Sequence, residues 1–375
     1  MISAGRTFDQ SPKTDETKRR RRRTSEKKRK ICDYNDFAES KEILNDRWLI
    51  KKKLGGGGFG QVYEVEDIST NIRGALKLEP IERKRIVLKM DERVLSDLKD
   101  QNHICELFAR GKTKMYYFII MSLKGKNLGQ LRKEQSGQRF TLSTTIRIAK
   151  QTLAALRVVH DGGYIHRDVK PTNFAIGLPP HEKVIYVLDF GLSRRFLRNT
   201  IEFDKISTHT KTCFRHQRSR PSFRGTIKYA SLNIHRRNEA GRRDDLYSWF
   251  YMIIEFLNGN LPWRQLYEKY DIEDAKEHFH EQREPMIHLP KHFHTILDHI
   301  ESLKDYKDRP NYDFILAHLE TIQTNYGVSD NDPFDWELKS KFLFNFPNAS
   351  HIKNRLKKRK KSKINRNEFT SFESS

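Results

Sequence analysis

Two short polar segments carry carboxylates and an amide in a pattern suited to phosphate chemistry. The first, His166-Arg167-Asp168-Val169-Lys170-Pro171-Thr172-Asn173, fits H-R-D-x-K-x-x-N. Asp168 could hold an attacking hydroxyl and accept its proton, while Lys170 would offset charge on the phosphoryl group in transfer. The second, Asp189-Phe190-Gly191, provides a carboxylate that could bind Mg²⁺ together with Asn173. The two segments predict phosphoryl transfer from a magnesium-bound nucleotide.

A glycine-rich segment upstream could bind the phosphates. The residues Leu54-Gly55-Gly56-Gly57-Gly58-Phe59-Gly60-Gln61-Val62 fit G-x-G-x-x-G-x-V. Without side chains, backbone N–H groups can approach phosphate oxygens closely. The pattern alone is weak, because a flexible glycine hairpin has the same composition. A dinucleotide-binding fold would need a helix after the loop, whereas residues 61–68 have the composition of a strand.

Lys77 ends the segment Ala75-Leu76-Lys77, seventeen residues after the last glycine of that loop. From a strand at this position its ammonium could reach the α- and β-phosphates, provided that a carboxylate on the next helix holds it. We expect that helix over residues 82–98, where Asp91 and Glu92 are the candidates. Adjacent helical residues point about 100° apart, so only one of them can face Lys77. An ordinary solvent-facing lysine is the alternative.

Three further segments are expected to position these residues. Residues 48–52 read as a strand before the glycine loop, and residues 184–188 read as a compact apolar strand that ends at Asp189. Ser143 is the expected N-cap of a helix that runs to His160 and carries apolar residues at helical spacing.

In this order and on these elements, the motifs resemble those of eukaryotic protein kinases. The segment Gly225-Thr226-Ile227-Lys228-Tyr229-Ala230-Ser231-Leu232-Asn233 stands where most kinases have A-P-E, and it resembles the casein kinase I superfamily. Other segments are most similar to tau-tubulin kinases and their relatives. These are residues 127–128, 141–145, 244–246, 261–264 and 334–337. The resemblance covers residues 44–337.

The resemblance implies a two-lobed α+β protein kinase fold, with a β-rich small lobe, a helical large lobe, and ATP and Mg²⁺ bound between them. The small lobe would span about residues 44–121, the hinge 122–125 and the large lobe 126–337. Met121 would be the gatekeeper, and the backbone of Leu123 would bind adenine. The residues implied in nucleotide binding are Leu54, Gly55, Gly56, Gly57, Gly58, Phe59, Gly60, Val62, Ala75, Lys77, Met121, Leu123, Asn173 and Asp189.

The resemblance also implies the class of substrate. Lys170 in the H-R-D-x-K pattern is similar to serine/threonine kinases, so the expected reaction is transfer of the γ-phosphate of ATP to Ser/Thr hydroxyls of proteins. Thr226 would orient Asp168, and Asp245 would brace the backbone of the catalytic loop. The resemblance to tau-tubulin kinases suggests cytoskeletal proteins as substrates, and the basic residues of segment 192–224 suggest acidic ones.

One departure concerns the carboxylate partner of Lys77. In the Lys-Met-Glu pattern of the family, Asp91 takes the place of the glutamate and is one methylene shorter. We therefore expect a longer or water-mediated pair with Lys77 and reduced activity, which Asp91→Glu should raise. A catalytically weak pseudokinase that binds acidic partners as a scaffold is the alternative function.

A second departure is the segment of residues 192–224, which is longer than in relatives and rich in arginine and lysine. It could recognise acidic or phosphorylated substrates through Arg218 and Arg220. Lys228, which matches an anion-binding arginine of casein kinase I relatives, would act with them. A solvated insertion without specific function is the alternative.

Most of the net charge of +23 lies near the two ends of the chain. Residues 1–30 hold 12 Lys/Arg against 4 Asp/Glu, and residues 338–375 hold 11 against 2. We expect basic, disordered tails over residues 1–43 and 338–375. They could be nuclear-import signals or contacts with nucleic acid, acidic protein tails or anionic membranes, and solvated tails are the alternative.

Composition sets the remaining expectations. With 36% hydrophobic residues the chain can form a sizeable core, which excludes a wholly disordered or collagen-like protein. Its apolar runs are too short to span a membrane, and its three cysteines are too dispersed for a disulfide framework or a CxxC metal site. We expect a cytoplasmic protein, with the nucleus possible, and assume a monomer.

Overall fold

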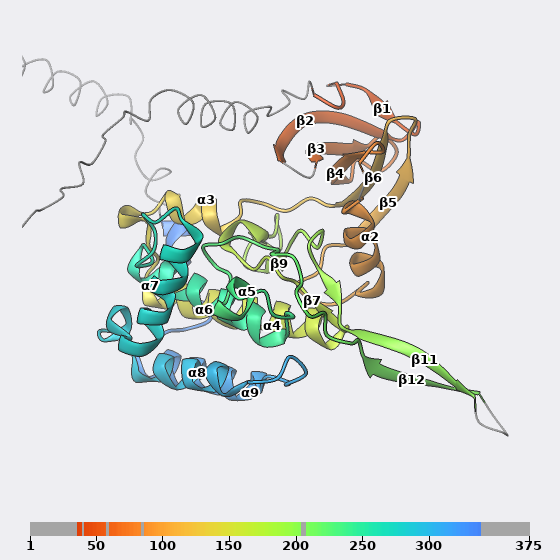
Figure 1. The fold of residues 1–375 in the computed structure, drawn as a ribbon. Coiled ribbons are helices and arrows are strands. Elements are labelled where there is room, and N and C mark those ends of the chain that lie inside the picture. Colours follow the sequence, from red (N-terminus) through yellow and green to blue (C-terminus); the bar gives the residue numbers. More distant parts are fainter. Residues whose placement is uncertain (1–35, 40, 58–59, 84–85, 204–207, 339–375) are drawn as a thin grey trace, which may run out of the picture.

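The structure is a computed structural model that describes residues 36–39, 41–57, 60–83, 86–203 and 208–338. A curled sheet with one helix forms the N-terminal lobe, and a mainly helical body forms the C-terminal lobe (Figure 1). The predicted two-lobed α+β kinase fold is thereby confirmed. No helix in these ranges has both the length and the apolar character needed to cross a bilayer.

The small lobe is built on one antiparallel sheet with the strand order β1-β2-β3-β4-β6-β5. The strands are β1 (Ile43–Leu44), β2 (Trp48–Gly57), β3 (Gly60–Asp67), β4 (Arg73–Pro80), β5 (Leu107–Lys112) and β6 (Tyr116–Ser122). On β4, Leu76 and Leu78 enter the core of this lobe. Because side chains alternate along a strand, Ala75 and Lys77 lie on the opposite face, toward the large lobe.

The packing of the small lobe begins before residue 44. Ala38 is buried in the core, and the ring of Phe37 stacks on Tyr116 with 4.8 Å between centroids. The backbone N–H of Phe37 donates to the hydroxyl of Tyr63 at 2.8 Å. Our expectation of a tail that extends to residue 43 is therefore wrong at this end, because residues 37 and 38 cover apolar surface of the sheet.

The glycine loop connects β2 to β3 as a hairpin, and the strand after it agrees with the prediction that no helix follows. Gly60 has φ of +152°, and a Cβ there would lie 2.1 Å from the carbonyl oxygen of Leu78. Only glycine therefore fits at residue 60 without moving the backbone of β4. Gly58 and Phe59 lie outside the described residues.

Helix α2 (Leu88–Asp97) is shorter than the predicted span of residues 82–98. Residues 83–85 are basic, and positive charge at a helix N-terminus is unfavourable with the helix dipole. In addition, the N–H of Leu88 donates to Glu79 Oε2 at 2.7 Å, so that a strand carboxylate caps the helix at this residue. Glu79 thus fixes where α2 begins relative to β4.

The large lobe is a set of helices around the buried helix α6 (Arg242–Asn258). The other helices are α3 (Leu128–Lys133), α4 (Leu142–Asp161), α5 (Leu232–His235), α7 (Lys269–Gln282), α8 (Lys291–Ser302) and α9 (Tyr312–Asn325). The cap of α4 is Thr141 and not Ser143 as expected, because the Thr141 hydroxyl accepts the N–H of Thr144 at 3.2 Å. The indole N–H of Trp249 donates to Thr152 at 2.9 Å and joins α6 to α4.

Short strands hold the two polar motifs together. They are β7 (Tyr164–Ile165), β8 (Phe174–Ile176), β9 (Ile185–Val187) and β10 (Arg194–Arg195). Strands β8 and β9 pair antiparallel, and the N–H of Leu188 donates to the carbonyl of Asn173 at 2.8 Å. This pairing places Asn173 at the start of one strand beside Asp189 after the end of the other.

The long basic segment contains a hairpin that the sequence analysis did not predict. Strands β11 (Leu197–Phe203) and β12 (Thr208–Phe214) pair over seven registered positions. The hairpin extends away from the body of the large lobe (Figure 1). The alternating threonines at 208, 210 and 212 are the strand signal that could have revealed it.

Candidate active site

Lys77 lies between two carboxylates that come from different parts of the chain. Its Nζ is 2.9 Å from Asp91 Oδ2 on α2 and 2.8 Å from Asp189 Oδ1 in the D-F-G segment. The Asp91 side chain is buried, whereas 41% of the Asp189 side chain is exposed toward the interlobe space. Glu92, the other candidate, faces outward and pairs with Arg110 at 3.0 Å.

The direct contact between Lys77 and Asp91 corrects the expectation of a longer or water-mediated pair. The missing methylene is compensated by the position of α2, which Glu79 holds close to β4. The second oxygen of Asp91 accepts the backbone N–H of Phe190 at 2.7 Å. The short carboxylate therefore joins the strand, the helix and the D-F-G segment.

Burial and charge act differently on the three groups. Burial alone would lower the pKa of Lys77, but the carboxylates of Asp91 and Asp189 raise it above its ordinary value. The charge of Lys77 lowers the pKa of Asp189 to about 2. Burial raises the pKa of Asp91, an effect that Lys77 opposes. Lys77 thus stays protonated, and Asp189 stays ionised in the part of the site that faces the cavity.

Asp168 is the centre of a second cluster, on the catalytic loop of residues 166–173. Its Oδ1 accepts the Thr226 hydroxyl at 2.7 Å, and its Oδ2 lies 2.6 Å from Lys170 Nζ. Asn173 Nδ2 donates to the Asp168 carbonyl at 2.8 Å. The structure therefore brings together all four of these sequence-predicted residues. The arrangement can hold a carboxylate in one orientation beside a cation, as a phosphoryl-transfer base requires.

The backbone of the catalytic loop is fixed from below by Asp245 of α6. The carboxylate accepts the N–H groups of His166 at 2.6 Å and Arg167 at 2.8 Å, and it also contacts His160 Nε2 at 2.9 Å. Arg167 and Asp189 both have φ near +65°, in the left-handed region. Such conformations cost about 1 kcal/mol or more for non-glycine residues, so the surrounding bonds must impose them.

A cavity of about 560 Å³ lies between the lobes and contains the predicted nucleotide residues that the structure describes. These are Leu54, Gly55, Gly56, Gly57, Gly60, Val62, Ala75, Lys77, Met121, Leu123, Asn173 and Asp189. The glycine loop between β2 and β3 lines one part of the cavity, and residues 121–127 line another. The volume is in the range of small-molecule sites.

Several lining residues were not identified from the sequence. Leu188 directly precedes the D-F-G segment, and this position could have indicated it. Glu64 and Arg73 line the cavity from β3 and β4 and form an ion pair at 2.7 Å. No motif marks this pair, because its two residues meet only through the register of the strands.

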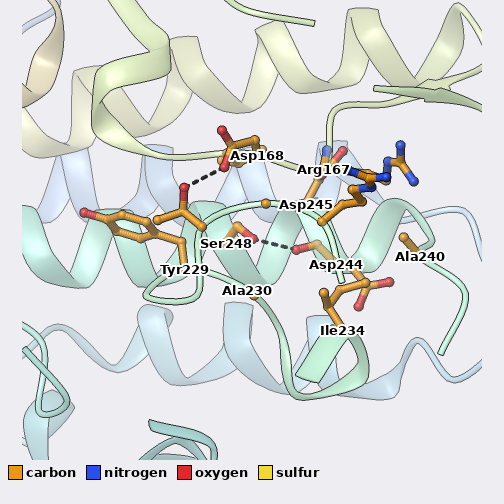
Figure 2. A pocket seen from close by; sticks show the side chains of 13 residues that line it. Arg167, Asp168, Tyr229, Ala230, Ile234, Ala240, Asp244, Asp245 and Ser248 are labelled. Carbon is orange, nitrogen blue, oxygen red and sulfur yellow. Dashed lines mark hydrogen bonds between the residues drawn. The ribbon is translucent and has the colours of Figure 1, made fainter. Parts of the chain in front are cut away.

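A much smaller cavity separates the catalytic loop from residues 225–230 and the start of α6 (Figure 2). Its volume of about 20 Å³ has room for about one water molecule and not for a ligand. Gly225 has φ of +102°, and a Cβ there would lie 2.4 Å from the carbonyl oxygen of Arg167. Glycine at residue 225 therefore allows the close approach of these two segments.

Comparison with known proteins identifies the family. Residues 48–319 match the protein kinase domain. The chain belongs to the protein kinase family. A protein named as a serine/threonine-protein kinase in Dictyostelium discoideum is 39% identical over 299 residues, which cover 80% of this chain and 58% of that protein. The serine/threonine-protein kinase spe-6 of Caenorhabditis elegans is 35% identical over 310 residues, which cover 80% of this chain and 78% of that protein.

These relatives confirm the predicted activity of the kinase. With the family shown and its relatives named as serine/threonine kinases, the chain is a serine/threonine protein kinase, and the pseudokinase alternative is not favoured. A Caenorhabditis elegans protein named as a candidate casein kinase I is 32% identical over 305 residues, which cover 79% of this chain and 84% of that protein. The name of this relative agrees with the resemblance to the casein kinase I superfamily.

The kinase also has a cavity of about 430 Å³ beside the catalytic loop, to which α2, the catalytic loop and the basic segment all contribute. Eight arginines line it. They are Arg93, Arg167, Arg194, Arg195, Arg198, Arg215, Arg218 and Arg224. Glu239 pairs with Arg218 at 2.7 Å and with Arg194 at 3.5 Å. Burial and the charges of Arg218 and Arg194 lower the pKa of Arg167 to about 10, as expected where positive charge exceeds negative charge.

Lys228 does not belong to this arginine cavity, contrary to our expectation. Its ammonium pairs with the buried carboxylate of Glu255, which also pairs with Arg132 at 3.1 Å and accepts the Tyr229 hydroxyl at 2.6 Å. A buried carboxylate needs cationic partners, and this requirement directs Lys228 inward.

Proposed function

We propose that the kinase transfers the γ-phosphoryl group of ATP with Asp168 as the base. The observation that carries the proposal is the position of Asp168, which Thr226, Lys170 and Asn173 hold by hydrogen bonds. Asp168 lies on the catalytic loop, whose Thr172 and Asn173 line the nucleotide cavity. A Ser or Thr hydroxyl next to Asp168 would pass its proton to the carboxylate as the new oxygen–phosphorus bond forms, while the bond from the γ-phosphorus to the β–γ bridging oxygen breaks and ADP leaves. Lys170 would offset the negative charge of the phosphoryl group, and Lys77 would bind the α- and β-phosphates while Asp91 holds it in place.

Asn173 and Asp189 fit the requirements of a Mg²⁺ site. Both line the nucleotide cavity, and Mg²⁺ prefers oxygen ligands of this kind. The amide nitrogen of Asn173 is engaged by Asp168, which leaves its amide oxygen as the ligand atom. When bound, Mg²⁺ neutralises phosphate charge. Adenine would contact the backbone of Leu123, behind the gatekeeper Met121.

Radiolabelled phosphate transfer to casein tests these roles directly. Asp168→Asn and Asp189→Asn should each lower transfer by about 10²-fold or more, because a base or a charge-stabilising group is lost. Asp161→Asn, an exposed carboxylate at the end of α4, is the matched control and should retain activity. Transfer that persists in Asp168→Asn would contradict the assignment of the base.

We further propose that the preferred protein substrates are acidic or already phosphorylated. The arginine cavity supports this, because eight guanidinium groups line it and Glu239 pairs with two of them. Guanidinium groups bind phosphate and carboxylate in a bidentate manner. The cavity includes Arg167, next to the proposed base, so an anion bound there would lie close to the reacting hydroxyl.

Arg198, Arg215 and Arg224 line this cavity without an ion pair to Glu239. Replacing all three with Ala should raise KM for an acidic peptide about tenfold and leave a neutral peptide within twofold. A variant with the same net charge, in which the exposed residues Lys183, Lys291 and Lys304 are each replaced with Ala, controls for the overall field. Equal loss on both peptides would contradict acidic recognition while leaving the kinase assignment intact.

Finer assignments rest on the resemblance. We propose that the kinase belongs with the tau-tubulin kinase-like group and that cytoskeletal proteins are among its substrates. It would act in the cytoplasm, with access to the nucleus through its basic tails. Residues 1–30 and 338–375, of which only Leu338 is among the described residues, would bind polyanions. Their deletion should abolish salt-dependent polyanion binding and leave peptide phosphorylation unchanged. Tubulin phosphorylated no faster than casein would contradict the cytoskeletal preference.

A further inference from the structure

The substrate loop, defined here as residues 225–230, is held from below by its backbone carbonyls. Lys276 Nζ of α7 donates to the carbonyl of Ile227 at 2.8 Å and to that of Ala230 at 2.6 Å. Between them, the carbonyl of Lys228 accepts the indole N–H of Trp263 at 2.8 Å. Three carbonyls of one short loop are therefore bound by two side chains that lie 35 to 49 residues away in sequence.

Lys276 is an unusual residue for this task because its side chain is 0% exposed. Its third hydrogen-bond partner is His235 Nε2 at 3.1 Å, and its Nζ lies 5.4 Å from the centroid of Tyr251 and 5.3 Å from that of Trp263. Burial lowers the pKa of Lys276 well below its ordinary value, and burial, followed by the charge of Lys276, lowers that of His235 to about 4. Desolvating an amine is costly, so the contacts to the loop must offset that cost.

Side chains of the loop also attach it to the large lobe, because Lys228 and Tyr229 both bind the buried carboxylate of Glu255. Residues 225–238 contain no Asp or Glu, so the segment cannot attach to the large lobe through an acidic side chain. Carbonyl groups are the acceptors that remain, and a buried lysine can bind two of them. Lys276 thus holds the backbone of the loop from α7, in addition to the contacts that Lys228 and Tyr229 make through their side chains.

The anchored residues adjoin the proposed base. Thr226 donates to Asp168 Oδ1 at 2.7 Å, and Ile227, the next residue, is 36% exposed on the outer side. A peptide whose hydroxyl reaches Asp168 must pass over this part of the loop. Displacement of the Ile227 carbonyl would therefore move the surface that the peptide contacts, while Asp168 would keep its bonds to Lys170 and Asn173.

We propose that Lys276 is a positioning residue for the protein substrate, acting through the carbonyls of Ile227 and Ala230. The role is separate from nucleotide binding, because Lys276 lines neither the nucleotide cavity nor the arginine cavity. Its loss should therefore raise KM for peptide and leave the reaction of ATP with water unaffected, since water needs no loop.

Lys276→Met tests this, because methionine is similar in length and lacks the donors. We expect KM for a peptide substrate to rise about tenfold, the effect of losing hydrogen bonds from a charged donor. Peptide-independent ATP hydrolysis and KM for ATP should stay within twofold. Equal loss of peptide phosphorylation and ATP hydrolysis would assign Lys276 a merely structural role and overturn the proposal, as would an unchanged KM for peptide.

Two variants make the test independent of folding defects. Lys269→Met is the matched control, since Lys269 is also on α7 but donates to the carbonyl of His235, beyond the loop. It should leave both activities unchanged. Trp263→Phe removes the indole N–H that binds the carbonyl of Lys228 and also shortens a buried ring. It should raise KM for peptide about threefold with normal ATP hydrolysis. If Trp263→Phe lowers both activities alike, the proposal fails even where Lys276→Met does not fold.

Discussion

The nucleotide side and the protein-substrate side of this kinase are assembled in different ways. On the nucleotide side, Lys77, Asp168 and Asp189 belong to short motifs, and strands with fixed register bring them together. On the substrate side, the loop of residues 225–230 depends on Lys276 and Trp263, which belong to no motif. Motifs therefore reveal the chemistry, whereas in our proposal tertiary contacts position the protein substrate.

The two sides also differ in electrostatic balance. Lys77 has two carboxylates within 3 Å, so the charges of the nucleotide side are largely matched before ATP binds. The arginine cavity has eight guanidinium groups, and Glu239 pairs with two of them. Uncompensated positive charge in a partly enclosed site attracts anions. In our proposal this excess of positive charge serves substrate recognition and not catalysis.

Among the substitutions that test the difference between the two sides, Asp91→Asn should have the largest effect on kcat. The neutral amide leaves Lys77 with Asp189 alone, and we expect kcat to fall about 10²-fold because the lysine is no longer held for the phosphates. Steady-state kinetics at saturating ATP measure the change. Glu92→Gln, at the next residue but facing Arg110, is the matched control and should retain kcat. A similar fall in both variants would indicate a general effect on α2.

Substitutions in the glycine loop should have the next largest effect, which is on KM for ATP. The effect should differ between two glycines that occupy equivalent positions in the motif. Gly60→Ala would force a Cβ against the Leu78 carbonyl, so KM for ATP should rise about tenfold as the loop is displaced. Gly55→Ala should change KM less than twofold, because no atom lies within 4 Å of a Cβ there. Titration of both variants with ATP is the measurement. Equal effects would show that flexibility, and not the contact at Gly60, matters.

A smaller effect is expected from Glu79→Ala, which releases the start of α2. Loss of the bond to Leu88 should lower the free energy of unfolding by about 1–3 kcal/mol, the cost of an unsatisfied buried donor. Because Asp91 lies in the first turn of this helix, kcat should also fall severalfold. Urea unfolding and steady-state kinetics measure the two effects. Normal kcat with reduced stability would show that Glu79 stabilises the start of α2 but does not determine the position of Asp91.

The pH dependence should show the smallest effect. Burial raises the pKa of Asp91, so its carboxylate takes up a proton at a higher pH than an ordinary aspartate and releases Lys77. In the pH profile of kcat, the fall on the acid side should therefore occur at a higher pH than an unperturbed Asp would give. This fall should be absent in Asp91→Asn. A raised folded-state pKa means that protonation of Asp91 favours the folded state as the pH falls, so circular dichroism should not change through the limb. An identical limb in both proteins would assign it to another group.

Much of the nucleotide side could be predicted from the sequence, because its residues occur at fixed spacing on elements with clear patterns. The substrate side could not, since Lys276 is an ordinary lysine in a polar helix until the fold places it beneath Ile227. The role of Glu79 on β4 was also not predictable from the sequence, because only the fold brings it to the N–H of Leu88. The distance between Lys77 and Asp91 was predicted wrongly, because it depends on the position of α2 as well as on the length of the side chain. The left-handed backbone at Arg167 and Asp189 likewise results from tertiary bonds.

The central claim is that Asp91, although shorter than glutamate, completes the active site by direct contact with Lys77. Comparison of kcat and thermal stability between the kinase and its Asp91→Glu variant tests it most directly. The Asp91 site is buried, so an added methylene should overpack it, lower the stability by about 1–3 kcal/mol and reduce kcat. A kcat above that of the unaltered kinase would contradict the claim and show that the natural pair is too long.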